Sequence, residues 1–404
     1  RGFAGSTGRR ALHEALSSRL PEHPVLVEER SGDGVLLNRA GLQSAGLDHG
    51  EGWFTGAAAA SARAALPGPS PAERRRRILR GQELLLGRGF TCVHLHGVEA
   101  PELQALARLH ASGGLAVRVV AYPRADAGAA PAEAPGVAGR GDDRLSVAGF
   151  HLDLDGALAT RGAALFEPYS DGAGGRGELR VERGAAAGLL VDRARAGLQP
   201  SLGAAGDRGV ALALDLLERC RSDVPGFVGL RARLEGVDLS TGDALGRLGS
   251  LGVVPSVQPA RLRGQSAWAA ARLGGERLLA LQPWSSLVAA AAQPLALGSG
   301  LPAAAADPRV TFHAAVTRRP SAEGPALVPA LALTAHQALG AMTSGAAYAA
   351  AQEDRRGLIA RGYGGDLTVL DVDLTLLGPG DAASALGARV VMTVVDGEIL
   401  FDAR

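Results

Sequence analysis

The 404-residue sequence contains no lysine, so all 42 of its basic residues are arginine, and asparagine occurs only at Asn38. Chemistry that needs an amine side chain is therefore excluded. This removes Schiff-base catalysis, a phosphate-loop lysine and a carbamylated lysine that bridges two metal ions. Alanine, glycine, arginine and leucine dominate instead, which is the composition expected of very GC-rich coding DNA.

Long apolar runs and a charge of one sign are also missing. Hydrophobic residues make up 47% of the chain but never form an uninterrupted stretch of membrane-spanning length, so we expect no membrane span. The formal net charge is only +1, which provides no broad positive surface for a nucleic-acid backbone. Neither a membrane nor a nucleic acid is an expected partner.

Cysteine is scarce, and the chain start shows no targeting signal. Cys92 and Cys220 are too few for a disulfide framework and do not have metal-ligand spacing. The sequence begins at Arg1 without a methionine or an apolar signal-peptide region. We therefore expect a cytoplasmic protein, from which an N-terminal piece is missing or has been removed.

Apolar β-type runs alternate with helical stretches rich in alanine, leucine and arginine, which is typical of repeated βα units on a parallel sheet. Eight strands are expected, at Pro24–Glu28, Phe90–His94, Ala116–Tyr122, Val147–Leu154, Gln199–Leu202, Gly229–Leu234, Val253–Val257 and Pro294–Gly298. This pattern predicts an α/β fold, a (β/α)₈ TIM-type barrel over residues 1–360. From Asp366, short antiparallel strands around an Asp396-Gly397 turn predict a small β appendage in residues 361–404.

Several sequence blocks stand in a characteristic order along the chain: Gly52-Trp53-Phe54-Thr55-Gly56, Gly89-Phe90-Thr91-Cys92-Val93-His94, Asp155–Arg161 with Glu167–Asp171, Gly206-Asp207-Arg208, Ser256-Val257-Gln258-Pro259, Ala314–Arg318 and Gly365–Asp371. In this order they resemble the amidohydrolase superfamily, in particular its family-3 branch, which contains proteins like N-substituted formamide deformylase. The resemblance implies a (β/α)₈ barrel with a small β-sandwich built from both chain ends. Because Arg1-Gly2-Phe3 is similar to the segment that opens the first barrel strand, we expect the sandwich to be incomplete in this sequence.

The resemblance also implies a centre of one or two divalent metal ions, whose ligand positions can be located in this chain. The opening His-x-His pair corresponds to Thr7 and Arg9, and the carbamylated lysine corresponds to His151. Two later histidine ligands correspond to Gly203 and Gly236, and the catalytic aspartate corresponds to Gly300. The full set of degenerate ligand positions is Thr7, Arg9, His151, Gly203, Gly236 and Gly300.

Three of these positions are glycine, and Arg9 would place a permanent positive charge where a cation should bind. The sequence therefore predicts a pseudoenzyme without cofactor, which keeps a structural or partner-binding role. Arg9 and Arg261 are candidates for contact with an anion or with a partner. Arg261 occupies a position where the family often has histidine.

The alternative is an active hydrolase with a relocated metal site. His94 and His96 are two residues apart on one expected strand, so both can point to one side, and His151 could join them around one zinc ion. Asp155 or Asp207 would carry the proton. Such an enzyme would cleave carbon–nitrogen bonds of small amides, outside peptides.

Association is a separate expectation. A barrel with an incomplete sandwich and many small or apolar helix positions is expected to bury surface against another subunit. We therefore predict an oligomer, formed by copies of this chain or with a different protein chain.

Overall fold

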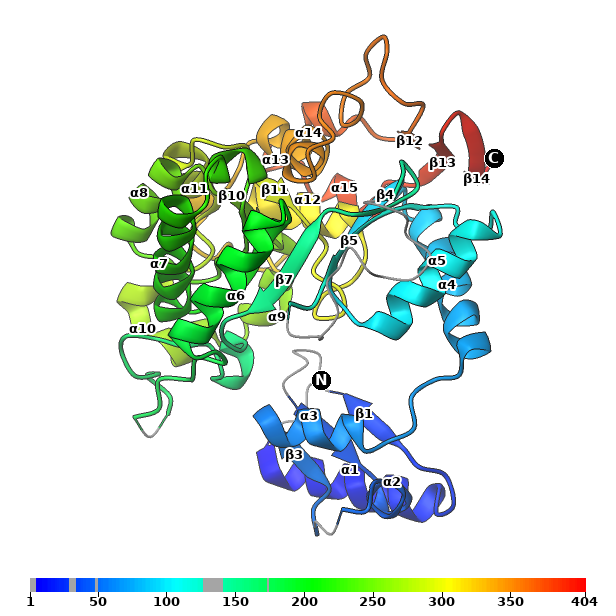
Figure 1. Cartoon of the computed structure of the whole chain (residues 1–404), viewed down its shortest axis with the longest axis vertical. Coiled ribbons are helices and arrows are strands. Elements are labelled where there is room, and N and C mark those ends of the chain that lie inside the picture. Colours follow the sequence, from blue (N-terminus) through cyan, green and yellow to red (C-terminus); the bar gives the residue numbers. More distant parts are fainter. Residues whose placement is uncertain (1–4, 29–33, 48–49, 126–140, 173) are drawn as a thin grey trace. The chain divides into compact units, whose positions relative to one another are not determined.

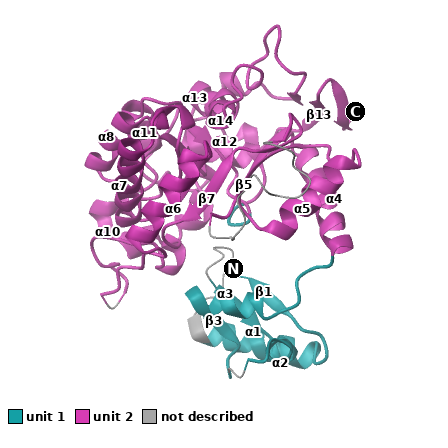
Figure 2. Ribbon diagram, viewed as in Figure 1, with its two compact units in different colours: residues 1–70, 302–304 teal, residues 71–301, 305–404 magenta. Residues whose placement is uncertain are grey.

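The structure, a computed structural model, describes residues 5–28, 34–47, 50–125, 141–172 and 174–404. The chain forms two compact units (Figure 2). Unit 1 comprises residues 1–70 and 302–304, and unit 2 comprises residues 71–301 and 305–404. Each unit is described by itself below.

Unit 1 combines helices with a small antiparallel sheet in the order β1-β2-β3. Its elements are α1 (Gly5–Arg19), β1 (Leu26–Glu28), β2 (Gly34–Leu37), α2 (Arg39–Ala45), β3 (Trp53–Thr55) and α3 (Gly56–Ala64). Asn38, the single asparagine, is fully buried and caps α2. Its Oδ1 accepts from the backbone N–H groups of Gly41 and Val25, and its Nδ2 donates to two backbone carbonyls.

Unit 2 begins with the alternation of strands and helices that the sequence pattern predicts (Figure 1). The strands are β4 (Cys92–Val98), β5 (Arg118–Pro123), β6 (Leu145–Val147), β7 (Gly149–Asp153), β8 (Gln199–Ala204), β9 (Arg233–Gly236), β10 (Val254–Val257) and β11 (Ala296–Leu297). The helices are α4 (Pro71–Leu86), α5 (Ala100–Ala111), α6 (Arg183–Arg195), α7 (Asp207–Asp223), α8 (Gly242–Leu251), α9 (Leu262–Gln265), α10 (Ala269–Leu278), α11 (Trp284–Ala290), α12 (Pro308–Thr317), α13 (Ala335–Met342), α14 (Ser344–Ala349) and α15 (Ser384–Gly387).

The parallel strands lie in two sheets, ordered β4-β5-β6 and β7-β8-β9-β10-β11. β6 and β7 are consecutive pieces of one extended stretch, and β5 joins the two sheets. Ala148 N–H donates to Ala121 O, Ala125 N–H donates to His151 O, and Arg124 forms a parallel bridge with His151. The result is a continuous parallel run from β4 to β11. In the described ranges no strand closes this run into a full barrel.

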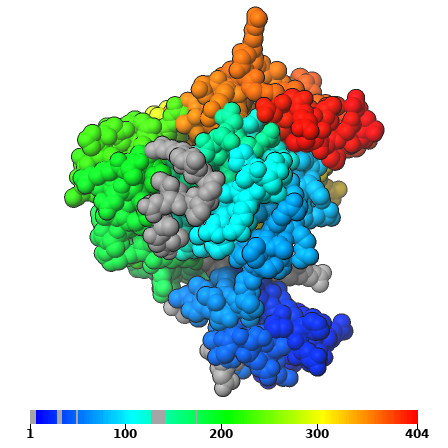
Figure 3. Space-filling model, turned by 45° about the vertical axis from the view of Figure 1, so that its right-hand side comes forward, coloured from blue at the N-terminus to red at the C-terminus, as the bar shows by residue number. Residues whose placement is uncertain are grey.

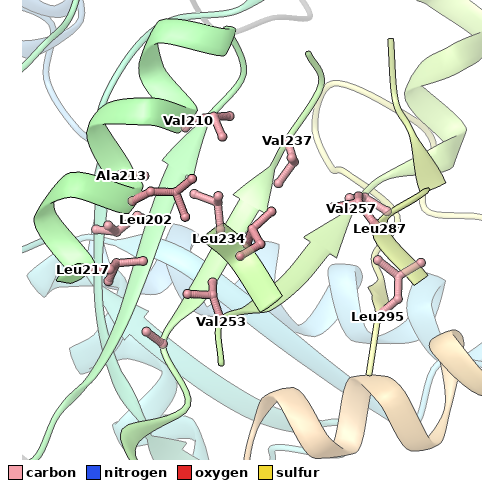
Figure 4. Packing of buried hydrophobic residues seen from close by; sticks show 14 of the residues in the cluster. Leu202, Val210, Ala213, Leu217, Leu234, Val237, Val253, Val257, Leu287 and Leu295 are labelled. Atoms are coloured by element: carbon pink, nitrogen blue, oxygen red, sulfur yellow. The ribbon is translucent and has the colours of Figure 1, made fainter. Parts of the chain in front are cut away.

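The main core lies between this sheet and the helices that follow its strands. Leu202 and Leu234 project from β8 and β9 against Val210, Ala213 and Leu217 of α7 (Figure 4). Leu248 of α8 and Leu190 of α6 belong to the same buried cluster. Burying such side chains contributes roughly 1.5–3 kcal/mol each, which is what holds the strands in register.

The C-terminal segment forms a three-stranded antiparallel sheet of β12 (Leu367–Leu370), β13 (Val390–Val395) and β14 (Glu398–Asp402). Positive φ angles at Asp396 and Gly397 form the predicted tight turn. Figure 3 shows the C-terminal segment in red at the surface of the molecule. The sheet packs beside α4, where Thr393 Oγ1 donates to Leu86 O. The Arg118 guanidinium on β5 donates hydrogen bonds to both carboxylate oxygens of Asp366, at 2.7 and 3.1 Å.

The structure corrects one expected strand. Pro24–Glu28 supplies β1, which pairs antiparallel with β2 in unit 1 rather than in the barrel, because its nearest partner follows within a few residues of the chain. The other expected strands overlap strands of the parallel run, although the first residues of Gly229–Leu234 belong to a 3₁₀ turn (Phe227–Leu230) and β9 begins only at Arg233. Arg1-Gly2-Phe3 lies outside the described residues. The division at residue 360 stays a prediction, and the compact units meet in the chain at Ser70 and Pro71.

Membrane-spanning segments are not found in the described part of the chain. None of the helices there combines sufficient length with sufficient apolarity to cross a bilayer.

Candidate functional site in the sheet interior

Polar side chains of unit 2 form a row across neighbouring parallel strands. Ser201 on β8 is the register partner of His151 on β7 and of Arg233 on β9. Two residues further along β8, Gly203 stands between Asp153 and Glu235. Because register partners of parallel strands point to the same side of a sheet, these groups converge on one face.

Arg233 is the centre of this arrangement and is only 2% exposed. Its Nε donates to Glu235 Oε1 at 2.8 Å, and its terminal nitrogens donate to the Tyr122 hydroxyl at 3.1 Å and to Ser256 Oγ at 3.3 Å. It also donates to His94 Nδ1 at 3.0 Å. Since a guanidinium carries donors only, His94 accepts at Nδ1.

A second chain of contacts joins the histidines. Ser201 Oγ lies 2.9 Å from His96 Nδ1 and 3.0 Å from His151 Nδ1. His151 Nε2 then donates to Asp153 Oδ1 at 3.2 Å. The His96 ring stacks on Tyr122, with ring centroids 4.6 Å apart, and meets His151 edge-on. This order of carboxylate, imidazole and hydroxyl is the pattern of an activated nucleophile. Ser201, however, has no exposed surface for a substrate to reach.

Burial and the arginine charge decide which of these groups are ionised. Burial lowers the pKa of His94 and His96 well below the ordinary range, and the positive charge of Arg233 lowers both further. Burial also acts to lower the pKa of Arg233, but Glu235 and Tyr122 raise it above its ordinary value. The interior thus holds a guanidinium beside neutral imidazoles.

Asp153 is held as a carboxylate. The Asp153 side chain lies at the margin of the network and is 55% exposed. Partial desolvation acts to raise the pKa of Asp153, but the hydrogen bond from His151 and the charges of His151, Arg180 and Arg124 outweigh this effect and bring it to about 2. His151 therefore faces a permanent anion at Nε2.

The structure brings several of the predicted ligand positions into this site. A Cβ atom at Gly203 would collide with Asp153 Oδ1 and lie 3.4 Å from His151 Nε2. Gly236 and Gly300 have φ angles of +95° and +75°, a left-handed region that favours glycine. A Cβ at Gly300 would lie 3.3 Å from Arg261 Cγ, so Arg261 stands beside the position of the expected catalytic aspartate.

Thr7 and Arg9 are placed elsewhere. The sequence overlay predicts them at the end of a barrel strand, but both lie on helix α1 of unit 1. The Arg9 guanidinium stacks over the Trp53 ring at 4.7 Å. Helix formers and an Arg10–Glu14 pair one turn apart explain why this segment is helical rather than extended.

The carboxylates expected to carry protons have backbone partners instead. Asp155 is buried and accepts from the backbone N–H groups of Ala164, Ala205 and Gly206, at 2.8–2.9 Å. Burial raises the pKa of Asp155 to about 7 although these hydrogen bonds act to lower it. Asp207 Oδ1 accepts from the backbone of Phe166 and Arg208. Both groups fix loops at the ends of β7 and β8.

The donors can be tested against the metal ion that the sequence resemblance implies. Within the part of the chain that the structure describes, no group of three or more His, Cys, Asp or Glu side chains is arranged to hold one. His94 Nδ1 faces a guanidinium, and His151 is engaged at both ring nitrogens. His94, His96 and His151 do lie in one network, but the residues present do not fit a metal ion.

Sequence reasoning missed the residues that organise this interior: Tyr122, Asp153, Ser201, Arg233, Glu235 and Ser256. A signal was present, because Arg233 and Glu235 are two apart on one strand, as are His151 and Asp153. Polar residues with period two on otherwise buried strands share a face. Applying that rule to every strand would have found the site.

Comparison with known proteins agrees with this architecture. The model of the Amidohydrolase family matches residues 6–401, so the chain belongs to the amidohydrolase family. It is 29% identical over 251 residues to the Bacillus subtilis (strain 168) protein named Putative amidohydrolase YtcJ, which covers 61% of this chain and 46% of that protein. It is 27% identical over 257 residues to Protein LONG AFTER FAR-RED 3 of Arabidopsis thaliana, covering 64% of this chain and 43% of the relative. The chain thus spans less than half the length of these curated relatives.

A solved structure gives the fold. An uncharacterized metal-dependent hydrolase from Pyrococcus horikoshii OT3 superposes with a TM-score of 0.76 and 28% identity, covering 88% of this chain and 73% of that chain. This neighbour and the family together imply an α/β, TIM-barrel-like fold for the present chain.

Proposed function

We propose that this chain is a non-catalytic member of the amidohydrolase family, with a structural or partner-binding role in the cytoplasm. The observation that carries the proposal is the buried Arg233, whose guanidinium donates to His94, Tyr122 and Glu235. These contacts lie in the network that contains His151 and adjoins Gly203, two of the positions at which the sequence resemblance implies metal ligands. A fixed cation in a buried interior repels a second cation.

The glycine positions support the same proposal. Gly203, Gly236 and Gly300 carry no donor atoms, and His151 cannot be carbamylated. Restoring a side chain at Gly203 would meet Asp153, and restoring one at Gly236 or Gly300 would strain the backbone. The proposal does not depend on Thr7 and Arg9, which belong to unit 1.

The competing function is a metal-dependent hydrolase of carbon–nitrogen bonds in small amides that uses His94, His96 and His151 with one zinc ion. The name of the Pyrococcus horikoshii neighbour favours this class of activity. Metal analysis and kinetics separate the two functions.

The test uses the 404-residue chain purified without chelator. We expect far less than one equivalent of zinc, manganese or iron per chain by mass spectrometry of the elements. We also expect background rates on N-acyl and N-formyl substrates with each metal added. His110→Ala, which removes an imidazole on α5 outside the network, is the matched control. Metal-dependent turnover that His151→Ala abolishes and His110→Ala leaves intact would establish the hydrolase instead.

A further inference from the structure

A pocket of about 250 Å³ opens on unit 2, and it shares no lining residue with the polar network of the sheet interior. Its walls come from α9, α12, the segment after α12, and α15. Apolar side chains of Val310, Ala314 and Leu386 line one part, and Arg263, Arg319 and His313 supply its positively charged and polar groups.

Among the polar lining residues, Ser321 Oγ accepts from the backbone N–H of Gly324, whereas Arg263, Arg319 and the Nε2 atom of His313 have no side-chain partner in the part of the chain that the structure describes. His313 is only 2% exposed, and its Nε2 has no hydrogen-bond partner there, although a buried polar atom is normally paired. Arg263 and Arg319 are exposed and, in the same described ranges, neither guanidinium forms an ion pair. Glu323, the acid on the adjoining segment, is not among the lining residues. The pocket therefore presents two cations and one unsatisfied imidazole nitrogen.

His313 is held neutral in this setting, because burial lowers its pKa and the charge of Arg319 lowers it further. A neutral imidazole with its proton on Nε2 donates one hydrogen bond. Arginine forks bind carboxylates with two parallel hydrogen bonds. An oxyanion in the pocket would thus satisfy all three side chains at once.

We infer that this pocket binds a small organic monocarboxylate with an apolar body. The carboxylate would meet Arg263, Arg319 and His313 Nε2, and the apolar body would cover Val310, Ala314 and Leu386. Most ligand sites combine a largely apolar lining with a few convergent polar groups in this way, and the modest volume limits the ligand to about the size of a substituted benzoate. This site is independent of the proposed loss of catalysis.

The experiment measures binding of 4-fluorobenzoate to the full chain by fluorine NMR line broadening, with the uncharged 4-fluorobenzamide as the matched probe. We expect saturable binding of the benzoate and much weaker binding of the benzamide. The double substitution Arg263→Gln and Arg319→Gln should weaken benzoate binding about tenfold or more, because it removes both charges and the forked hydrogen bonds to the carboxylate. His313→Gln should weaken it less.

The matched control is Arg75→Gln with Arg76→Gln, which removes the same charge from the exposed side of α4. It should bind benzoate like the unaltered chain. Far-ultraviolet circular dichroism checks that each variant is folded. Equal affinity for benzoate and benzamide, equal weakening in the control variant, or no saturable benzoate binding would overturn the inference, as would binding of inorganic phosphate in preference to benzoate.

Discussion

At the scale of single residues, Arg233 is the buried charge around which the polar interior of the sheet is arranged. A buried guanidinium is tolerated only when its donors are satisfied and its charge is compensated. Glu235 supplies the charge, and His94, Tyr122, Ser256 and the backbone carbonyl of Ala349 accept from the terminal nitrogens. The contacts that stabilise Arg233 also occupy hydrogen-bonding atoms of His94, Tyr122 and Glu235 inside the sheet.

Removal of the Arg233 guanidinium should destabilise the folded chain. We expect Arg233→Met to lower the free energy of unfolding by about 3–5 kcal/mol, because Glu235 would remain as a buried, unpaired charge. Replacing both residues by methionine should recover much of the loss. Urea unfolding measures both variants.

Arg231→Met is the control for that experiment, because Arg231 forms a partly exposed pair with Glu353. Its loss should lower the free energy of unfolding by about 1 kcal/mol or less. If Arg233→Met lowered the free energy of unfolding no more than Arg231→Met does, the stability of the sheet interior would not depend on the Arg233 guanidinium.

Asp155 predicts a dependence of stability on pH. Its pKa in the folded chain is about 7, against an ordinary value of 3.8, because it is buried. Between these values the folded chain holds a proton that the unfolded chain has released, so the contribution of Asp155 to stability falls as pH rises from about 4 to 7. The slope approaches about 1.4 kcal/mol per pH unit at most.

The prediction is tested by urea unfolding at several pH values between about 5 and 7, inside the window in which the two states differ in bound protons. We expect Asp155→Asn to be less stable overall, because an amide nitrogen cannot accept from the backbone N–H groups, and to lose the downward slope. Glu276→Gln, at an exposed position, should keep the slope of the unaltered chain. Identical slopes in all three proteins would contradict the assignment.

At the scale of secondary-structure elements, glycine sets the ends of strands. Gly236 closes β9 with a φ of +95°, and a Cβ there would approach Ala204 O to 2.9 Å. Most residues would adopt this conformation only with backbone strain.

We therefore expect Gly236→Ala to lower the free energy of unfolding by roughly 1–3 kcal/mol. Gly246→Ala is expected to change the free energy of unfolding in the opposite direction. Gly246 lies in α8 with open space where a Cβ would stand, so alanine should stabilise the helix by about 0.5–1 kcal/mol. Thermal unfolding distinguishes the two, and a stable Gly236→Ala variant would show that the position does not require glycine.

Elements were predicted well where the chain repeats a local pattern. Apolar runs separated by helical stretches located the parallel strands from β4 onward, and Asp396-Gly397 located the hairpin of β13 and β14. The sequence pattern predicts the wrong sheet for Pro24–Glu28, because an apolar run does not indicate which strand it will pair with. Thr7 and Arg9 lie in a helix and not at the end of a barrel strand, because local helix formers decide the conformation of this segment and a motif overlay does not take them into account.

At the scale of the whole molecule, association remains a prediction. Ile359 is 92% exposed, and Leu358 and Leu376 are also exposed, which is unfavourable for a chain on its own. We expect light scattering to give a mass above that of one chain, or a partner to co-purify. Ile359→Glu should shift a homomeric assembly toward the single-chain mass, whereas Glu276→Gln should not. A single-chain mass at every concentration, without a co-purifying partner, would contradict the prediction.

The alternating α/β pattern, the exclusion of lysine chemistry and the family resemblance can all be inferred from the amino-acid order alone, because each depends on residues close together in the chain or on composition. The folded chain was needed to show that Arg233 contacts His94, 139 positions away in sequence, and that Ser201 lies between His96 and His151. It also placed Thr7 and Arg9 in unit 1 and, among the described residues, left His313 Nε2 unpaired in a pocket with two arginines. These are long-range contacts, whose partners depend on strand register and packing rather than on the residues next to them in sequence.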